Sequence, residues 1–194
     1  MEKIIEFLFG VGMAELTLPQ ILTQLVGFGP AVASLIASQC KKLTTILPWN
    51  ALSNLLLAVT YTLAGGFSGA GICYTAVIQT MISYFYARKK KEVPLWQTFV
   101  FLAIYLLIAV FTYKGPSDII PAVASITYAL AVVQSKPLGY RIFLSVNSAL
   151  WVIYDIVVMA YTMVLTHGLL LVSLLIAIVR YDIKKRPENV EVEK

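Results

Sequence analysis

The feature that most constrains this chain is the alternation of long apolar blocks with short charged connectors. Each block is about 17–21 residues long, which is the length an α-helix needs to cross a hydrocarbon core of about 30 Å. Only 13% of the residues are charged, whereas 59% are hydrophobic. A soluble helical bundle would carry a polar stripe along each helix, and these blocks lack one. We therefore expect an all-α integral membrane protein with the lipid bilayer as its surroundings.

Seven transmembrane helices are predicted, joined by connectors too short to hold a soluble domain. The predicted spans are Ile21–Cys40, Thr44–Ala64, Ala70–Ala87, Leu95–Tyr113, Ser117–Gln134, Tyr140–Ala160 and Thr162–Tyr181. Residues 1–20 are apolar but contain too short an apolar run to span, and they carry Glu6 and Glu15. We interpret them as an interfacial segment on the outer surface, with a poor signal peptide as the alternative.

The distribution of basic residues predicts the orientation of these spans. The odd-numbered connectors and the C-terminal tail hold Lys41, Lys42, Arg88, Lys89, Lys90, Lys91, Lys136, Arg141, Arg180, Lys184, Lys185 and Arg186, and the even-numbered connectors hold only Lys114. The positive-inside rule places the basic side in the cytoplasm, so the N-terminus is expected outside and the C-terminus inside. Because the basic residues form short separate clusters, the sequence does not indicate binding to nucleic acid.

The chain contains an internal repeat with an offset of about 92 residues. The pentapeptide Pro-Ala-Val-Ala-Ser occurs at residues 30–34 and again at residues 121–125. Further markers recur in the same order. The paired positions are Pro30 and Pro121, Asn54 and Asn147, Tyr61 and Tyr154, and Arg88 and Arg180. The repeated unit therefore comprises three helices, and the fourth predicted helix lies between the two units.

This repeat predicts two parallel three-helix units joined by a linker helix, which is the architecture of SWEET transporters. Because one helix intervenes, both units enter the membrane from the same side and are related by an axis along the membrane normal. The predicted divisions are an N-terminal segment (1–20), the first repeat (21–87), a cytoplasmic loop with the linker helix (88–116), the second repeat (117–182) and a cytoplasmic tail (183–194).

Five short motifs together carry a resemblance to a known family. They are Leu22–Gly27, Leu52–Leu56, Thr112–Pro116, Trp151-x-x-Tyr154-Asp155 and Ile178–Asp182. In this order and spacing the chain resembles the YgjV-type bacterial inner-membrane protein family, over roughly residues 20–183. The resemblance implies a multi-pass protein of the bacterial inner membrane. It does not imply a particular substrate.

Polar side chains at membrane depth are candidates for a solute-binding site, because they usually face the bundle interior or an aqueous path. Asn54 and Asn147 occupy equivalent places near the middle of their helices, where both amides could reach a central cavity. Trp151, Tyr154 and Gln79 are further substrate-binding candidates. The alternative is that the amides form hydrogen bonds between helices within each unit, which stabilise by about 0.5–2 kcal/mol.

Asp155 and His167 are predicted to lie at matching depth on adjacent helices. A carboxylate and an imidazole at that depth could share a proton, and imidazoles exchange protons near neutral pH. The alternative is a static polar pair. Pro30 and Pro121 are predicted as hinges, because proline breaks the hydrogen-bond ladder of a membrane helix.

These features favour a transporter of a small neutral or zwitterionic solute, with a non-transporting membrane scaffold or sensor as the alternative. We do not expect an enzyme, because one histidine, two separated cysteines and one core aspartate do not form a convincing catalytic centre. A microbial rhodopsin would need a Schiff-base lysine in the last span, and none lies between Thr162 and Arg180. No cofactor or metal site is expected, and an oligomer is compatible with the sequence.

Overall fold

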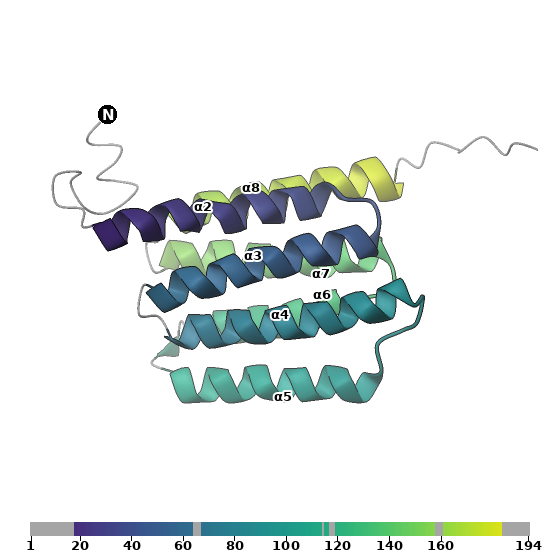
Figure 1. Ribbon diagram of the computed structural model, residues 1–194, viewed down its shortest axis with the longest axis horizontal. Coiled ribbons are helices and arrows are strands. Elements are labelled where there is room, and N and C mark those ends of the chain that lie inside the picture. Colours follow the sequence, from purple (N-terminus) through teal and green to yellow (C-terminus); the bar gives the residue numbers. More distant parts are fainter. Residues whose placement is uncertain (1–17, 64–66, 114, 117–118, 158–160, 184–194) are drawn as a thin grey trace, which may run out of the picture.

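The computed structural model describes residues 18–63, 67–113, 115–116, 119–157 and 161–183, and the described part is all-α (Figure 1). Its helices are α2 (Leu18–Gln39), α3 (Leu43–Leu63), α4 (Phe67–Arg88), α5 (Leu95–Thr112), α6 (Ile119–Val132), α7 (Pro137–Val157), α8 (Tyr161–Ala177) and a π-helix, η3 (Ile178–Ile183). Each of the seven α-helices overlaps one predicted span. Nearly all of the predicted interfacial segment and of the predicted tail lies outside the described residues.

Four of the described helical segments are long and apolar enough to cross a membrane. They are Leu43–Thr60, Leu95–Thr112, Pro137–Val157 and Met163–Ile183, and Ile119–Val132 is an apolar but shorter helix. Large apolar side chains on their outer faces are exposed, with Phe111 84% and Leu95 76% accessible. Such a surface is stable in hydrocarbon and unstable in water, so the bilayer is the environment of these helices.

Six helices pack in a closed ring, and the seventh lies outside it. Around the ring, α2 contacts α3, α3 contacts α4, α4 contacts α6, α6 contacts α7, α7 contacts α8, and α8 returns to α2. Helix α5 packs outside the ring against α4 and α6, on the side of the bundle away from α2 and α8 (Figure 1). The short connectors make successive helices antiparallel, so every second connector lies at the same end.

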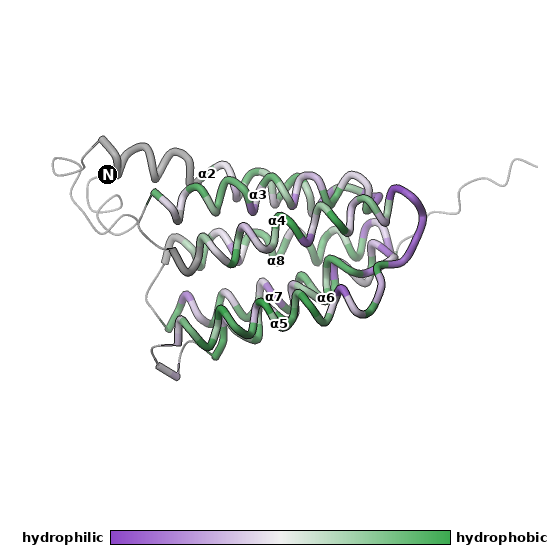
Figure 2. The backbone as a smooth tube through the Cα atoms, turned by 60° about the horizontal axis from the view of Figure 1, so that its bottom comes forward, coloured by the Kyte–Doolittle hydropathy of each residue, from purple (hydrophilic) through white to green (hydrophobic). Residues whose placement is uncertain are grey.

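One end of the bundle collects the hydrophilic connectors, as Figure 2 shows. Residues 40–42, 89–94 and 133–136 lie at this end, together with η3. Glu92 accepts a hydrogen bond from Ser135 at 3.4 Å, and the Lys41 ammonium lies 5.6 Å from the Tyr181 ring centre. The exposed side chains Lys41, Lys42, Arg88, Lys89, Lys90, Lys91, Lys136 and Arg180 lie here, and we call this the basic end.

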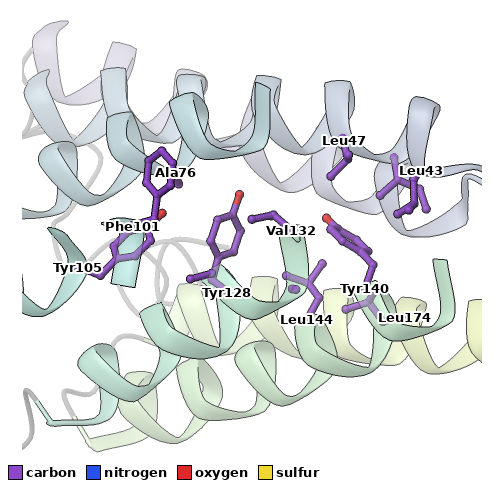
Figure 3. Packing of buried hydrophobic residues seen from close by; sticks show 13 residues of the cluster. Leu43, Leu47, Ala76, Phe101, Tyr105, Tyr128, Val132, Tyr140, Leu144 and Leu174 are labelled. Carbon is purple, nitrogen blue, oxygen red and sulfur yellow. The ribbon is translucent and has the colours of Figure 1, made fainter. Parts of the chain in front are cut away.

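Part of the hydrophobic core lies next to the basic end. Figure 3 shows Leu43, Leu47, Tyr140, Leu144 and Leu174 gathered at one side of the buried cluster. Each of these side chains is at most 8% exposed. They come from α3, α7 and α8, so they fill the middle of the ring at that end. Close packing of this kind leaves little room for water between these side chains.

Arg141 differs from its predicted place among the connector charges. It lies inside α7, where its side chain is only 1% exposed. Its guanidinium forms an ion pair with Asp182 of η3 at 2.5 Å and donates to the Cys40 carbonyl oxygen at 2.5 Å. A buried charge needs such partners. A count of charges along the sequence cannot show them, because Asp182 lies 41 residues away.

The two predicted hinge prolines occupy different places in their helices. Pro30 lies well inside α2, where the missing backbone N–H interrupts the helical ladder. Pro121 is the third residue of α6 as its described residues begin, within the first turn. First-turn N–H groups have no intrahelical acceptor, so a proline there breaks no hydrogen bond. The physical argument for a hinge therefore applies to Pro30, and for Pro121 the hinge stays a prediction without that support.

Candidate functional site: a cavity inside the helix ring

A cavity of about 220 Å³ lies inside the ring, and all seven α-helices contribute to its wall. The volume suits a small solute rather than a drug-sized ligand. Most of the wall is apolar, with a limited set of polar groups. The polar and aromatic lining residues include Phe28, Ser34, Asn50, Ser53, Asn54, Thr60, Tyr105, Ser125, Tyr128, Asn147, Trp151, Thr166 and His167.

The cavity extends away from the basic end. Its lining on α7 runs from Leu144 to Trp151, and on α8 it runs from Leu170 back to Met163, near the start of that helix. Phe28, which also lines it, is 59% exposed in the half of α2 that lies away from the basic end. The buried core next to the basic end therefore lies between the cavity and that end.

A network of side chains from three helices forms part of the wall. The Tyr128 hydroxyl of α6 donates to Asn50 Oδ1 at 2.6 Å and accepts from Asn54 Nδ2 at 2.9 Å. It also lies 2.8 Å from Thr80 Oγ1 of α4. Asn54 donates in addition to the Asn50 carbonyl oxygen at 2.9 Å. One tyrosine thus connects α3, α4 and α6 through buried hydrogen bonds.

The repeated asparagine of the second unit has a different partner. Asn147 lines the cavity and donates through Nδ2 to the Ala124 carbonyl oxygen of α6 at 2.6 Å. This bond stays within its own helix triplet, as the structural alternative for this residue requires. The Asn54 bond to Tyr128 instead crosses from α3 to α6. Both asparagines therefore line the same cavity, but Asn54 bonds to a helix of the other triplet and Asn147 bonds within its own triplet.

Asp155 and His167 form a close pair behind the cavity wall. His167 Nδ1 lies 2.7 Å from Asp155 Oδ2. The imidazole lines the cavity, whereas the Asp155 carboxylate does not and is only 4% exposed. Trp151 stacks on the imidazole with ring centres 5.7 Å apart and planes 19° from parallel. The predicted juxtaposition is therefore present, and its role in proton transfer stays a prediction.

Two other predicted binding residues do not line the cavity. Gln79 is buried between α4 and α6, where Nε2 donates to the Ala129 carbonyl oxygen at 3.2 Å. Tyr154 packs edge-on against Trp151, with ring centres 5.7 Å apart. Trp151 itself lines the cavity. Tyr154 therefore contacts a residue of the cavity wall, and Gln79 contributes to the packing of two helices.

Several lining residues were not anticipated from the sequence. Asn50 precedes Asn54 by four residues, so the shared helix face was a usable signal. Tyr128, Tyr105 and Cys73 sit in apolar segments with no marker that distinguishes them from packing residues. Among the described residues, no group of three or more His, Cys, Asp and Glu side chains is placed to hold a metal ion.

A hydrogen-bonded seam between α2 and α8 closes the ring near the basic end. Ser38 Oγ lies 2.6 Å from Ser173 Oγ, and Gln39 Nε2 donates to Ser173 Oγ at 2.8 Å and to its carbonyl oxygen at 2.9 Å. We call these three residues the α2–α8 seam. Together with the Arg141 contacts to Asp182 and Cys40, the seam joins the first helix of the ring to the last.

The fold and the cavity define a multi-pass helical membrane protein with a solute-sized internal site. The model of the bacterial inner membrane protein family Imp-YgjV matches residues 21–185, so the chain belongs to this family. Its location is therefore the bacterial inner membrane. The family description names a location and not an activity. No curated protein and no solved structure matches the chain.

Proposed function

We propose that the protein is a SWEET-like transporter that moves a small neutral or zwitterionic solute across the bacterial inner membrane by alternating access. The observation that carries the proposal is the cavity of about 220 Å³ inside the ring, which is separated from the basic end by the buried side chains of Leu43, Leu47, Tyr140 and Leu174. A transporter needs such a site near the middle of the membrane, with barriers that open in turn on either side. A non-transporting scaffold needs neither.

The order of the helices supports the two-repeat part of this proposal. In the triplet α2–α3–α4 the middle helix contacts both neighbours, and the same holds for α6–α7–α8, while α5 lies outside. The repeated pentapeptides also make matching local contacts. Ser34 Oγ donates to the Pro30 carbonyl oxygen at 2.8 Å, and Ser125 Oγ donates to the Pro121 carbonyl oxygen at 2.9 Å.

The orientation in the proposal follows from the charges at the basic end. Lys and Arg side chains concentrate on the cytoplasmic side of inner-membrane proteins. The basic end is therefore assigned to the cytoplasm, and the conformation described is one with the cytoplasmic barrier closed. The α2–α8 seam and the Arg141 contacts form this barrier. A non-transporting scaffold or sensor is the alternative, and neither catalysis nor an oligomer is required.

Cysteine reactivity at the cavity tests alternating access. Cys73 lines the cavity, so Cys40→Ser leaves a single native thiol there. A membrane-impermeant thiosulfonate should modify Cys73 faster in right-side-out vesicles than in inside-out vesicles. Ser173→Ala removes the two seam contacts made by the Ser173 hydroxyl, with Ser38 and Gln39, so it should raise the cytoplasmic reaction rate about two- to tenfold for each hydrogen bond lost.

The control is Ser83→Ala, since Ser83 is a buried serine of α4 whose hydroxyl has no hydrogen-bond partner in the described part of the chain, whereas the partly buried Ser173 hydroxyl has two. Its cytoplasmic rate should equal that of the parent. Lys90→Cys in a cysteine-free variant reports sidedness, because it should react only in inside-out vesicles. Equal Cys73 rates from both sides, or an unchanged rate in Ser173→Ala, would contradict the proposal.

Coupling to protons is a separate part of the proposal and concerns Asp155 and His167. The 2.7 Å contact supports it, because at this distance a proton can pass directly between the carboxylate and the imidazole. Solute uptake into proteoliposomes should respond to an imposed pH gradient in the parent. The response should disappear in Asp155→Asn and in His167→Gln. Uptake that is unaltered in both variants would eliminate the proton role and leave facilitated diffusion.

A further inference from the structure

The two repeated asparagines present the same atom to the cavity. Asn54 Nδ2 donates to the Asn50 carbonyl oxygen at 2.9 Å, and Asn147 Nδ2 donates to the Ala124 carbonyl oxygen at 2.6 Å. A main-chain carbonyl can only accept, so each amide must turn its nitrogen toward the backbone. No described residue donates a hydrogen bond to either Oδ1 atom. Neither oxygen is among the fully buried polar atoms that lack a partner, so both are partly accessible. Each asparagine therefore leaves an acceptor oxygen available to a solute.

The serine hydroxyls on the wall are also used as donors inside the protein. The Ser34 and Ser53 hydroxyls each lie 2.8 Å from the Pro30 carbonyl oxygen and 2.7 Å from each other, so one donates to the carbonyl and the other to the carbonyl or to its neighbour, and both hydrogens are used. Ser125 donates to the Pro121 carbonyl oxygen at 2.9 Å. A hydroxyl has one hydrogen and two lone pairs. What remains on these three side chains is acceptor capacity.

His167 adds an acceptor when its ring is neutral. The Asp155 carboxylate accepts from Nδ1–H, so the lone pair of the neutral imidazole is on Nε2. The remaining donors on the wall are the Trp151 indole N–H, the Asn50 amide nitrogen and the Tyr105 hydroxyl, which has no partner among the described residues and is only 2% exposed. None of the described residues that line the cavity is a lysine or an arginine.

From this bias toward acceptors we infer that the cavity takes a small solute rich in hydrogen-bond donors, a polyol or a protonated amine, and rejects carboxylates and other anions. The inference rests on the proposed function, because it names the class of solute that would be moved. While the His167 ring is neutral, an anion in this cavity would lose its hydration and meet acceptor oxygens with no cation to balance it. Donor groups instead find unpaired oxygens on opposite walls. Zwitterionic amino acids are excluded as well, because they carry a carboxylate, so this inference keeps the neutral part of the proposed solute class, drops the zwitterionic part and adds protonated amines.

Three probes with the same four-carbon backbone test the solute class. They are erythritol, which is neutral, 1,4-diaminobutane, which is cationic, and succinate, which is anionic. The readout is protection of Cys73 from the neutral reagent N-ethylmaleimide in purified Cys40→Ser protein. Erythritol or diaminobutane should slow the reaction, and succinate should not. Which of the two donor probes protects decides between a polyol and an ammonium solute.

A pair of amide substitutions tests the role of the acceptor oxygens. Asn147 and Gln79 both donate to a carbonyl of α6, but of these two only Asn147 lines the cavity. Asn147→Leu should weaken protection by the donor probe about two- to tenfold, the effect of one lost hydrogen bond. Gln79→Leu should leave protection unchanged. If Asn147→Leu does not fold, the probe series on the parent still decides the question.

Several results would overturn the inference. They are protection by succinate equal to that by the donor probes, protection by none of the probes, and full protection of Asn147→Leu. Flux into proteoliposomes separates this inference from the transport proposal. A donor probe that protects Cys73 but is not transported would support the inferred solute class and contradict the transport proposal. Transport of succinate would support the transport proposal and contradict the inferred solute class.

Discussion

Asp182→Ala is expected to destabilise the protein by about 3–5 kcal/mol, because it leaves the buried Arg141 guanidinium without its carboxylate partner. The Arg141 side chain is 1% exposed, so water cannot replace the lost ion pair. The contacts that remain are the Cys40 carbonyl oxygen and the Tyr181 ring, whose centre lies 5.5 Å from the guanidinium. Denaturant-induced unfolding of the purified protein in detergent measures the loss.

Two further variants isolate the cause of this effect. Arg180 also lies over the Tyr181 ring, at 5.2 Å, but its side chain is exposed, and Arg180→Ala should cost about 1 kcal/mol or less. The double substitution Arg141→Met with Asp182→Ala should be less damaging than Asp182→Ala alone, because no unpaired charge remains. If Asp182→Ala and Arg180→Ala had similar effects, the buried ion pair would not be what holds α7 to η3.

Tyr128→Phe is expected to destabilise the protein by about 1–3 kcal/mol, whereas Tyr105→Phe should have almost no effect. The Tyr128 hydroxyl contacts Asn50, Asn54 and Thr80 at 2.6–2.9 Å, and its loss leaves polar groups unpaired inside the ring. The Tyr105 hydroxyl is buried without a hydrogen-bond partner in the described part of the chain. Removing it therefore breaks no bond and relieves an unsatisfied group.

This comparison is well matched, because both variants lose one phenolic oxygen from a side chain that is at most 9% exposed. The measurement is again the unfolding free energy in detergent. A loss in Tyr105→Phe as large as that in Tyr128→Phe would show that the network around Tyr128 does not join α3, α4 and α6. Equal stability of both variants with the parent would have the same meaning.

The positions of the helices were predictable from sequence because the cause is local. An apolar block of membrane-crossing length satisfies its backbone hydrogen bonds only as a helix, whatever surrounds it. Each predicted span accordingly overlaps one of α2 to α8. The pairing of Asp155 with His167 was also accessible, because the connector between their helices is short and both residues lie at similar distances from it.

The positions of the two repeated asparagines could be predicted from the sequence, but their hydrogen-bond partners could not. The repeat singled out Asn54 and Asn147, and both line the cavity. Their different hydrogen-bond partners were not predictable, because Tyr128 belongs to a helix remote in sequence. Gln79 was an equally plausible polar group, yet it faces the contact between α4 and α6. The rotation of a helix about its own axis decides between these outcomes.

The sequence by itself determined the membrane environment, the seven helices and the repeated markers, since hydrophobic length and helical hydrogen bonding act within each segment. Only the tertiary structure decided the order of helices around the ring, the burial of Arg141 against Asp182 and the acceptor oxygens that face the cavity. The physical reason is that a membrane helix is apolar on its lipid-facing and its protein-facing sides alike. The phase of its hydrophobic pattern therefore carries little information about which side chains point inward.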